Sequence, residues 1–162
     1  MRRIRKKFKK PRSPWNMTKI KDERKLLTEY GLRRKKEMLI AQDVLRNYRQ
    51  RARELIAEKD KEKERILIEK MARIGLLPKK ESTLDDVLAL GINSVLDRRL
   101  QTLVFRKAIA KTPMQARQLI VHGHVFVAGR RMRFPSYTVP VDEERKIMLR
   151  IPEKKTRTPV EE

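Results

Sequence analysis

The only two histidines of the chain, His122 and His124, flank one glycine in the segment "VHGHV". Two imidazoles this close could share a metal ion, work as an acid and a base, or belong to a surface that holds an anion. A zinc site needs three or four ligands, but residues 98–141 contain no Asp or Glu and the chain contains no cysteine. The sequence therefore predicts no metal site and no cofactor.

Acid–base catalysis has equally little support around these histidines. The surrounding residues offer no nucleophile with an orienting carboxylate, and the region lacks the spacing of a G-x-S-x-G turn or a P-loop. We expect no catalytic residues and no enzyme. Two interpretations stay open. The histidines are satisfied structural side chains, or they lie beside Arg117 and Arg130 as neutral donors and stacking planes on a phosphate-binding surface.

The charge of the chain favours an anionic partner. Lys and Arg number 43 against 21 Asp and Glu, for a net charge of +22. Ten basic residues fall within residues 1–21 and nine within residues 98–141, and neither segment contains an acidic residue. Such a surface repels itself unless it meets a polyanion, and nucleic acid is the commonest one inside cells. An anionic membrane surface is the alternative partner.

The composition narrows the class of protein further. Without cysteine there is no disulfide framework. No apolar run approaches the roughly 18 residues of a membrane span, and the basic start "MRRIRKKFKK" is not followed by the apolar segment of a signal peptide. We therefore expect an intracellular protein that does not span a membrane.

The first half of the chain predicts an arm followed by helices. Residues 1–19 are too basic and too poor in apolar residues to fold alone, so we expect an extended arm. Trp15 either stacks on a base or, in the interpretation we prefer, anchors the arm to the protein body. Apolar periodicity and capping residues then predict four helices. The first begins at Asp22 and ends near Gly31, and the second spans residues 33–58. The third runs through "KERILIEKMARI" and ends at Gly75. The fourth runs from a cap at Ser82 or Thr83 to a stop at Gly91.

The second half predicts two helices and a small sheet. Ser94 and Asp97 form a capping pattern ahead of an apolar stripe that predicts one helix through Ala108. Thr112 is expected to cap the amide of Gln115, with Gln115 capping Thr112 in return and a proline at the first helical position. After Gly123 the apolar period changes to two, which predicts strands. They are "HVFVA", "RRMRF", "SYTVPV" and "KIMLRI".

These elements predict an α+β fold, with a helical N-terminal domain followed by a small module of two helices and a curled, mainly antiparallel sheet. The expected boundaries are an arm over residues 1–19, a helical domain over 20–91, the module over 92–152 and a tail over 153–162. The helix N-terminus at Thr112, with Lys111 before it, presents unpaired amides to an anion. Because the basic patch spreads over two helices and a turn, it suits irregular folded RNA better than a DNA groove.

The candidate RNA-binding residues come from the arm, from the start of the long helix and from the basic zone near the histidines. They are Arg2, Arg3, Arg5, Lys6, Lys7, Lys9, Lys10, Arg12, Arg33, Arg34, Arg98, Arg99, Arg106, Lys107, Lys111, Thr112, Gln115, Arg117, Gln118, His122, His124, Arg130 and Arg131.

The segment "RRLQTLVFRKAIAKTPMQARQLIVHGHVFVAGRRMRFPSYTV" resembles the RNA-binding domain named after small-subunit ribosomal protein four. The matching features are Arg99-Leu100, "QARQLIVHGHV", "AGR" and "PSY". Gln101 stands where bacterial members usually have Asp, so the resemblance is to the archaeal and eukaryotic branch. Outside this domain, "PRSPW", "EYGLRRKKE", "RQRARELI", "RIGLLP" and "LDDVLALGI" resemble the arm and helical domain of the archaeal-type ribosomal protein, so coverage runs from about residue 8 to 151.

That resemblance implies a structural constituent of the small ribosomal subunit. It implies a primary binder of the 5′ domain of small-subunit rRNA, near the channel through which messenger RNA enters and beside small-subunit proteins three and five. It further implies a cytoplasmic protein that works in the ribosome and not as a homo-oligomer. The cysteine zinc site of many bacterial relatives is not expected here. A pseudouridine synthase would need a further catalytic domain, whereas a stand-alone RNA-binding protein or a DNA compactor stays possible.

Overall fold

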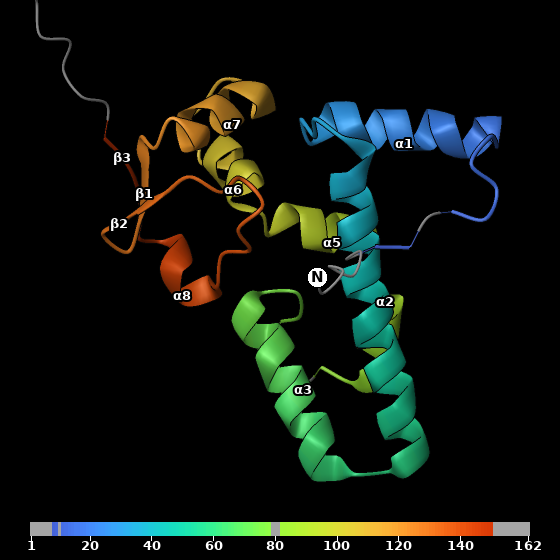
Figure 1. Cartoon of the computed structure of the whole chain (residues 1–162). Helices are drawn as coiled ribbons and strands as arrows, with labels where there is room; N and C mark the ends of the chain where they lie inside the picture. The colour runs from blue at the N-terminus through green and yellow to red at the C-terminus, as the bar shows by residue number, and fades with distance from the viewer. Residues whose placement is uncertain (1–7, 10, 79–81, 151–162) are drawn as a thin grey trace, which may run out of the picture.

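The computed structural model describes residues 8–9, 11–78 and 82–150. Its longest helix, α2 (Lys35–Glu58), runs the height of the molecule, with α1 (Met17–Glu29) crossing its N-terminal end and α3 (Lys61–Ile74) returning beside it (Figure 1). Six predicted RNA-binding residues lie outside the described residues, as does the expected tail over 153–162. They are Arg2, Arg3, Arg5, Lys6, Lys7 and Lys10.

The first helix begins earlier than predicted. Helix α1 starts at Met17 and not at Asp22, because the side chain of Asn16 accepts hydrogen bonds from the amides of Thr18 and Lys19 at 3.1 and 3.4 Å. An Asn at this position satisfies amides that would otherwise lack an intrahelical partner. Residues 17–19, which the prediction assigned to the arm, therefore lie in α1. The predicted stop is confirmed, since Gly31 follows the helix with a φ of +58°.

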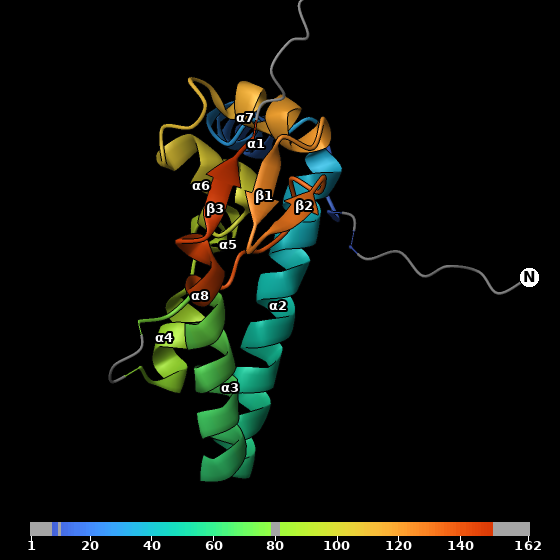
Figure 2. The ribbon, with the colours of Figure 1, turned by 90° about the vertical axis from the view of Figure 1, so that its left-hand side faces the viewer.

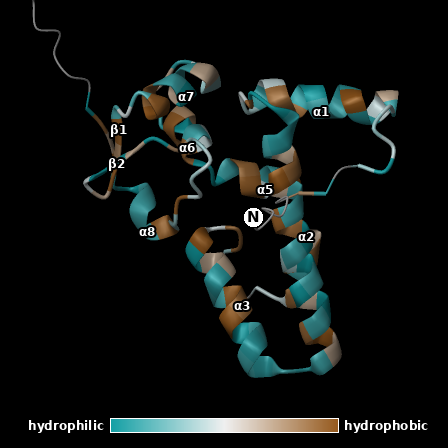
Figure 3. Cartoon of the chain, viewed as in Figure 1, coloured by the Kyte–Doolittle hydropathy of each residue, from teal (hydrophilic) through white to brown (hydrophobic). Residues whose placement is uncertain are grey.

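The helical hairpin of α2 and α3 confirms the predicted apolar stripe. Ala41, Leu45 and Ala52 of α2 are buried, and the predicted end at Gly75 takes a left-handed φ of +81°. Along both helices apolar and polar residues alternate at helical spacing (Figure 3). The next helix, α4 (Leu84–Ala89), has the predicted cap, because Thr83 and the side chain of Asp86 form a reciprocal capping box. The hairpin and α4 thus follow directly from local sequence.

One predicted helix is in fact two. In place of a single helix from Ser94 to Ala108, the chain forms α5 (Ile92–Asp97) and α6 (Leu100–Arg106). Gly91, predicted as a helix stop, directly follows the C-cap of α4 and is also the N-cap of α5. Arg99 is extended between the helices, because the amide of Leu100 donates to the carbonyl of Tyr137 at 2.7 Å and that of Val139 donates to Arg98 at 3.0 Å.

The same pairing explains why "SYTVPV" forms no strand. This segment makes only an isolated bridge between Thr138 and Arg99 and then enters a short helix, α8 (Val141–Glu144). The other three predicted strands are confirmed as β1 (Val125–Val127), β2 (Arg130–Met132) and β3 (Ile147–Leu149). They form an antiparallel sheet in the order β2-β1-β3, with Phe126 opposite Arg131 on one side and Met148 on the other. The α+β fold class is confirmed.

Two apolar cores lie in the described part of the chain. The first gathers α1 to α5, including Val95 and Leu96 of α5. The second gathers α6, α7 (Pro113–Val121) and the sheet. Figure 2 shows α7 and the sheet beyond the end of α3, with α8 next to α3. The expected domain boundaries at residues 19, 91 and 152 stay a prediction.

Gln101 joins the two cores. Its side chain is fully buried, and its amide nitrogen donates to the carbonyls of Tyr30, Gly31 and Pro113 at 3.2, 2.8 and 3.0 Å. A buried amide is stable only when its donors are satisfied, and these partners come from both halves of the chain. The second half is therefore held in place against the end of α1. No helix in the described ranges is both long enough and apolar enough to cross a bilayer.

Candidate nucleic-acid interface

Several exposed basic and polar side chains of the second half have no side-chain partner among the residues that the structure describes. Lys111, Gln118, His122 and Arg130 are exposed, and none forms a side-chain hydrogen bond or ion pair with another described residue. Arg33 and Arg34, just before α2, are equally exposed and equally free within the described ranges. These six side chains can be offered to an anion without breaking an internal contact.

The N-terminus of α7 has nearly the predicted geometry. The hydroxyl of Thr112 accepts from the amide of Gln115 at 3.1 Å, and Pro113 occupies the first turn. The predicted return contact, in which the side chain of Gln115 caps the amide of Thr112, does not form. The Gln115 side chain instead accepts a hydrogen bond from the amide of Lys111 at 2.8 Å. The difference is one residue, because the glutamine side chain is long enough to reach the amide before the cap. The helix end remains exposed beside the free ammonium of Lys111.

The histidine pair lies at the other end of α7. The two rings are stacked with centroids 6.2 Å apart and an interplanar angle of 16°. His122 is exposed and His124 is half-buried. Within the described ranges no group of three His, Cys, Asp or Glu side chains is placed to hold a metal ion. The stacked imidazoles form a flat polar surface at the end of α7, whereas Arg130 lies at the other end of β1, so the structure does not bring the histidines and Arg130 together as predicted. The role of the histidines in RNA binding stays a prediction.

The side chain of Arg131 binds the C-terminal end of α7. Its guanidinium donates to the carbonyl of Gly123 at 2.8 Å and to that of His122 at 2.9 Å. A cation at this end satisfies carbonyls that have no intrahelical donor and opposes the helix dipole. Gly123 has a φ of +76°, and a Cβ there would clash with the Arg131 guanidinium. The glycine therefore both ends the helix and makes room for the arginine.

Two predicted contacts, Arg99 and Arg117, instead converge on one carboxylate. Arg99 donates to Glu37 at 2.6 Å, and Arg117 donates to both oxygens of Glu37 at 3.1 and 2.9 Å. Burial by itself would raise the pKa of Glu37, but the hydrogen bonds from Arg117 and Arg99 outweigh it, so its pKa lies below the usual value. We call these three residues the Glu37 network. It ties α2 to α6 and α7.

Arg98 has a similar internal role. Its guanidinium donates to the carbonyls of Ile74 and Val139 at 3.0 and 2.7 Å and to Glu144 at 2.8 Å. These bonds use one donor from each of the three guanidinium nitrogens, and they join α3 to α8. The available donors of Arg98 are therefore directed into the protein.

Two further predicted RNA-binding residues, Arg106 and Lys107, bond to neighbouring groups at the protein surface. Arg106 donates to Asp97 at 2.5 Å, and Lys107 donates to the carbonyl of Glu144. Asp97 also accepts from the hydroxyl of Tyr30 at 3.0 Å. Burial and this hydrogen bond raise the pKa of Tyr30 to about 12. Both Arg106 and Lys107 remain exposed, so these contacts leave room for a competing phosphate.

The arm meets the body along α1 and α2. Lys9 and Arg12 are exposed and line a hollow of about 420 Å³ together with Gln42 and Arg46. Lys36 lies over the ring of Phe8, 5.8 Å from its centroid. Trp15 has 86% of its surface exposed, so the preferred prediction that it anchors the arm was wrong. The alternative prediction, that the exposed indole of Trp15 stacks on a base, remains.

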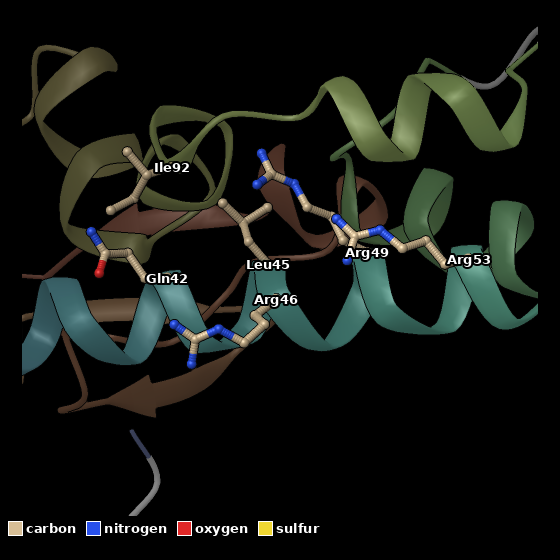
Figure 4. Close-up of a pocket in the computed structure, with 6 residues that line it drawn as sticks. All are labelled: Gln42, Leu45, Arg46, Arg49, Arg53 and Ile92. Carbon is tan, nitrogen blue, oxygen red and sulfur yellow. The ribbon is translucent and has the colours of Figure 1, made fainter. Parts of the chain in front are cut away.

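Sequence reasoning missed three arginines of α2. Arg46, Arg49 and Arg53 line one groove with Gln42, Leu45 and Ile92, and its volume is about 580 Å³ (Figure 4). Their spacing of three and four residues places them on one face of a helix. That spacing in "RNYRQRAR" was a usable signal, but the neighbouring acidic residues made the segment look like an ordinary solvated face.

Comparison with known proteins identifies a domain family and relatives that match most of the chain. Residues 98–144 match the family model described as "S4 domain". The chain is 47% identical to small ribosomal subunit protein uS4 of Methanococcus aeolicus over 146 residues, which cover 88% of this chain and 82% of that protein. It is 48% identical to the uS4 protein of Methanococcus vannielii, over 90% of this chain and 84% of that one.

A third relative lies in another archaeal genus. The uS4 protein of Saccharolobus islandicus is 45% identical over 88% of this chain and 81% of its own length. These matches extend well beyond the S4 domain, so they include the helical half that carries Glu37 and the arginines of α2. The chain therefore belongs to the family of small ribosomal subunit protein uS4.

Proposed function

We propose that this chain is a constituent of the small ribosomal subunit that binds small-subunit rRNA, with no enzymatic activity. The observation that carries the proposal is its identity of 45–48% to uS4 proteins over most of both chains. A match to the S4 domain alone would leave other RNA-binding proteins open, because one fold can serve several functions. The match across both halves favours the ribosomal protein.

The charge and the geometry support RNA as the partner. A net charge of +22 would oppose compaction unless it were neutralised by a polyanion. Free side chains project from separate elements, including Arg34 before α2, Lys111 before α7 and Arg130 at the β1–β2 turn. Contacts spread in this way suit an irregular folded RNA that is recognised through its backbone and shape.

The finer assignment rests on the resemblance. We infer that the protein binds the 5′ domain of the rRNA as a single copy, near the channel through which messenger RNA enters. We also infer that it contacts small-subunit proteins three and five and works in the cytoplasm, within the ribosome. The candidate contacts in the described ranges are the free side chains above, together with Arg106, Lys107 and Arg131, which are exposed although each also bonds within the protein.

A binding comparison tests the proposal. The full chain is titrated against folded small-subunit rRNA and against duplex DNA of equal length, at the same salt concentration. We expect tighter binding to the rRNA that persists at salt concentrations where the DNA is released, because only part of a specific complex depends on counterion release. Equal affinity at every salt concentration would instead favour a DNA compactor.

The stand-alone RNA-binding protein is the second candidate. In a lysate separated on a sucrose gradient, a ribosomal constituent sediments with small subunits at near-stoichiometric amounts and remains there after a moderate salt wash. A stand-alone protein remains near the top of the gradient, or is stripped from the subunits by the wash.

A further inference from the structure

The groove lined by Arg46, Arg49 and Arg53 lies on a face of α2 that the S4 domain does not occupy. Figure 4 shows Arg49 and Arg53 toward the upper edge of the helix and Arg46 along its lower edge, with Ile92 of α5 across from Gln42. The lining runs from Gln42 to Arg53, which at 1.5 Å per residue is about 16 Å along the helix axis. We call it the α2 groove. Its length exceeds that of one small anion.

The positive charge of the α2 groove is poorly balanced within the protein. Arg46 pairs with Asp43 at 2.8 Å, but no carboxylate of the described residues lies within 4.0 Å of Arg49 or Arg53. Arg49 is half-buried and donates to the carbonyl of Leu90, while its Nε is buried without a partner. A partly buried guanidinium is costly unless an anion balances its charge, although the buried Nε itself is out of reach of a ligand in the groove.

The α2 groove is continuous with the arm. The hollow beside Lys9 and Arg12 shares two lining residues with it, Gln42 and Arg46. The two hollows therefore adjoin along α2, and the one beside the arm is lined by Asp22 and Glu23 as well as by basic residues. The opposite face of α2 carries Glu37, which is directed toward Arg99 and Arg117. Helix α2 thus separates two basic regions of the protein.

We infer that the α2 groove binds consecutive phosphates of one RNA strand, as a contact separate from that of the S4 domain. This inference rests on the proposed function and specifies a site for it. A row of guanidiniums at helical spacing follows a repeating anion, because each planar fork can hold one phosphate through two hydrogen bonds. The apolar side chains of Leu45 and Ile92 also line the groove and lower its local polarity, which strengthens these contacts.

The test compares two double variants of the full chain with equal loss of charge. Arg49→Gln with Arg53→Gln removes two cations of the α2 groove. Arg51→Gln with Arg65→Gln removes two exposed cations that line other hollows and have no ion pair within the described ranges. Affinity for folded small-subunit rRNA is measured over a series of salt concentrations.

We expect the groove variant to bind at least about tenfold more weakly, since it loses two charge-assisted contacts. The slope of log K against log salt should fall by about 1.4 to 1.8, which corresponds to two phosphates at 0.7–0.9 each. The control variant should lose less than half as much slope. Equal changes in the two variants would overturn the inference and reduce the effect to net charge.

Further variants separate the possible failures. Arg53 is exposed, so Arg53→Gln alone tests the site even if removal of Arg49 lowers stability. If the wild-type chain does not prefer the rRNA, the proposed function itself fails. If Arg130→Gln weakens rRNA binding and the groove variant does not, only the α2 groove is refuted. Competition by an acidic peptide but not by single-stranded RNA would likewise overturn the inference in favour of a protein partner.

Discussion

Arginine has two uses in this protein, and the surroundings of each side chain decide between them. Arg98 directs its donors to two carbonyls and one carboxylate of its own chain, whereas Arg130 extends from a turn without an internal partner in the described ranges. The same planar fork that suits a phosphate also suits a backbone carbonyl next to a carboxylate. A basic residue in an acid-free segment therefore identifies an interface less reliably than a basic residue with free donors.

Trp15 allows a test of stacking at the level of one residue. Because 86% of it is exposed, Trp15→Ala should leave the free energy of unfolding unchanged within about 0.5 kcal/mol. If the indole stacks on a base, the same change should weaken RNA binding by about 1–3 kcal/mol. The fluorescence of this single tryptophan should also change when RNA is added to the wild type. Ser13→Ala, on the same exposed arm, is the control and should do neither.

The histidine pair allows a second test. Replacing His122 and His124 with Gln keeps hydrogen-bonding capacity but removes good ligands for first-row metals. We expect the double variant to fold normally and to lose no more than about 1–2 kcal/mol of RNA affinity. Arg130→Gln should cost more, because it removes a charge-assisted contact. Loss of folding in the histidine variant would support a purely structural role, and stoichiometric zinc in the wild type alone would show that the metal was wrongly excluded.

Helix α7 is stabilised at both ends and still has an exposed polar side chain at each end. Thr112 caps the start while Lys111 stays free beside it, and Arg131 closes the end while His122 stays exposed. The start was predictable because caps are local. The contact at the end was not, because Arg131 reaches Gly123 from β2 and only the pairing of β1 with β2 brings them together.

The start of α7 can be tested for its two roles separately. Thr112→Ala should destabilise the protein by about 1 kcal/mol through the lost cap, as measured by denaturant unfolding. Thr112→Asp keeps a capping oxygen but adds a negative charge where we expect a phosphate. Stability retained with RNA affinity lost supports the phosphate site. An Asp variant that binds RNA as well as the wild type would exclude it.

At the scale of the whole molecule, local patterns predicted the elements and long-range bonds decided how they meet. The stripe on α2 and the ends at Gly31 and Gly75 followed from periodicity and capping. The break between α5 and α6 did not, because it depends on the hydrogen bond from Leu100 to Tyr137, which are far apart in the sequence. Free and internally bonded arginines could not be separated for the same reason.

The Glu37 network makes a further contact between the two halves. The side chains of Glu37, Arg99 and Arg117 are only 18%, 7% and 20% exposed, so removing the carboxylate leaves two poorly solvated cations without a counter-ion. We expect Glu37→Gln to lower the free energy of unfolding at pH 7 by about 2–3 kcal/mol. Glu58→Gln is the control. Its side chain is 56% exposed and lies 3.5 Å from Lys63, so its loss should cost less than about 1 kcal/mol.

The pH dependence identifies the charge of Glu37 as the cause. Because the pKa of Glu37 is lower in the folded than in the unfolded protein, its contribution to stability is fully present above the unfolded value of about 4.3 and is lost as the pH falls through the folded value. The difference in unfolding free energy between wild type and Glu37→Gln should therefore shrink when measured at pH 3 instead of pH 7. A difference that stays constant over this range would show that Glu37 acts through packing, and that the two halves are joined mainly by the buried amide of Gln101.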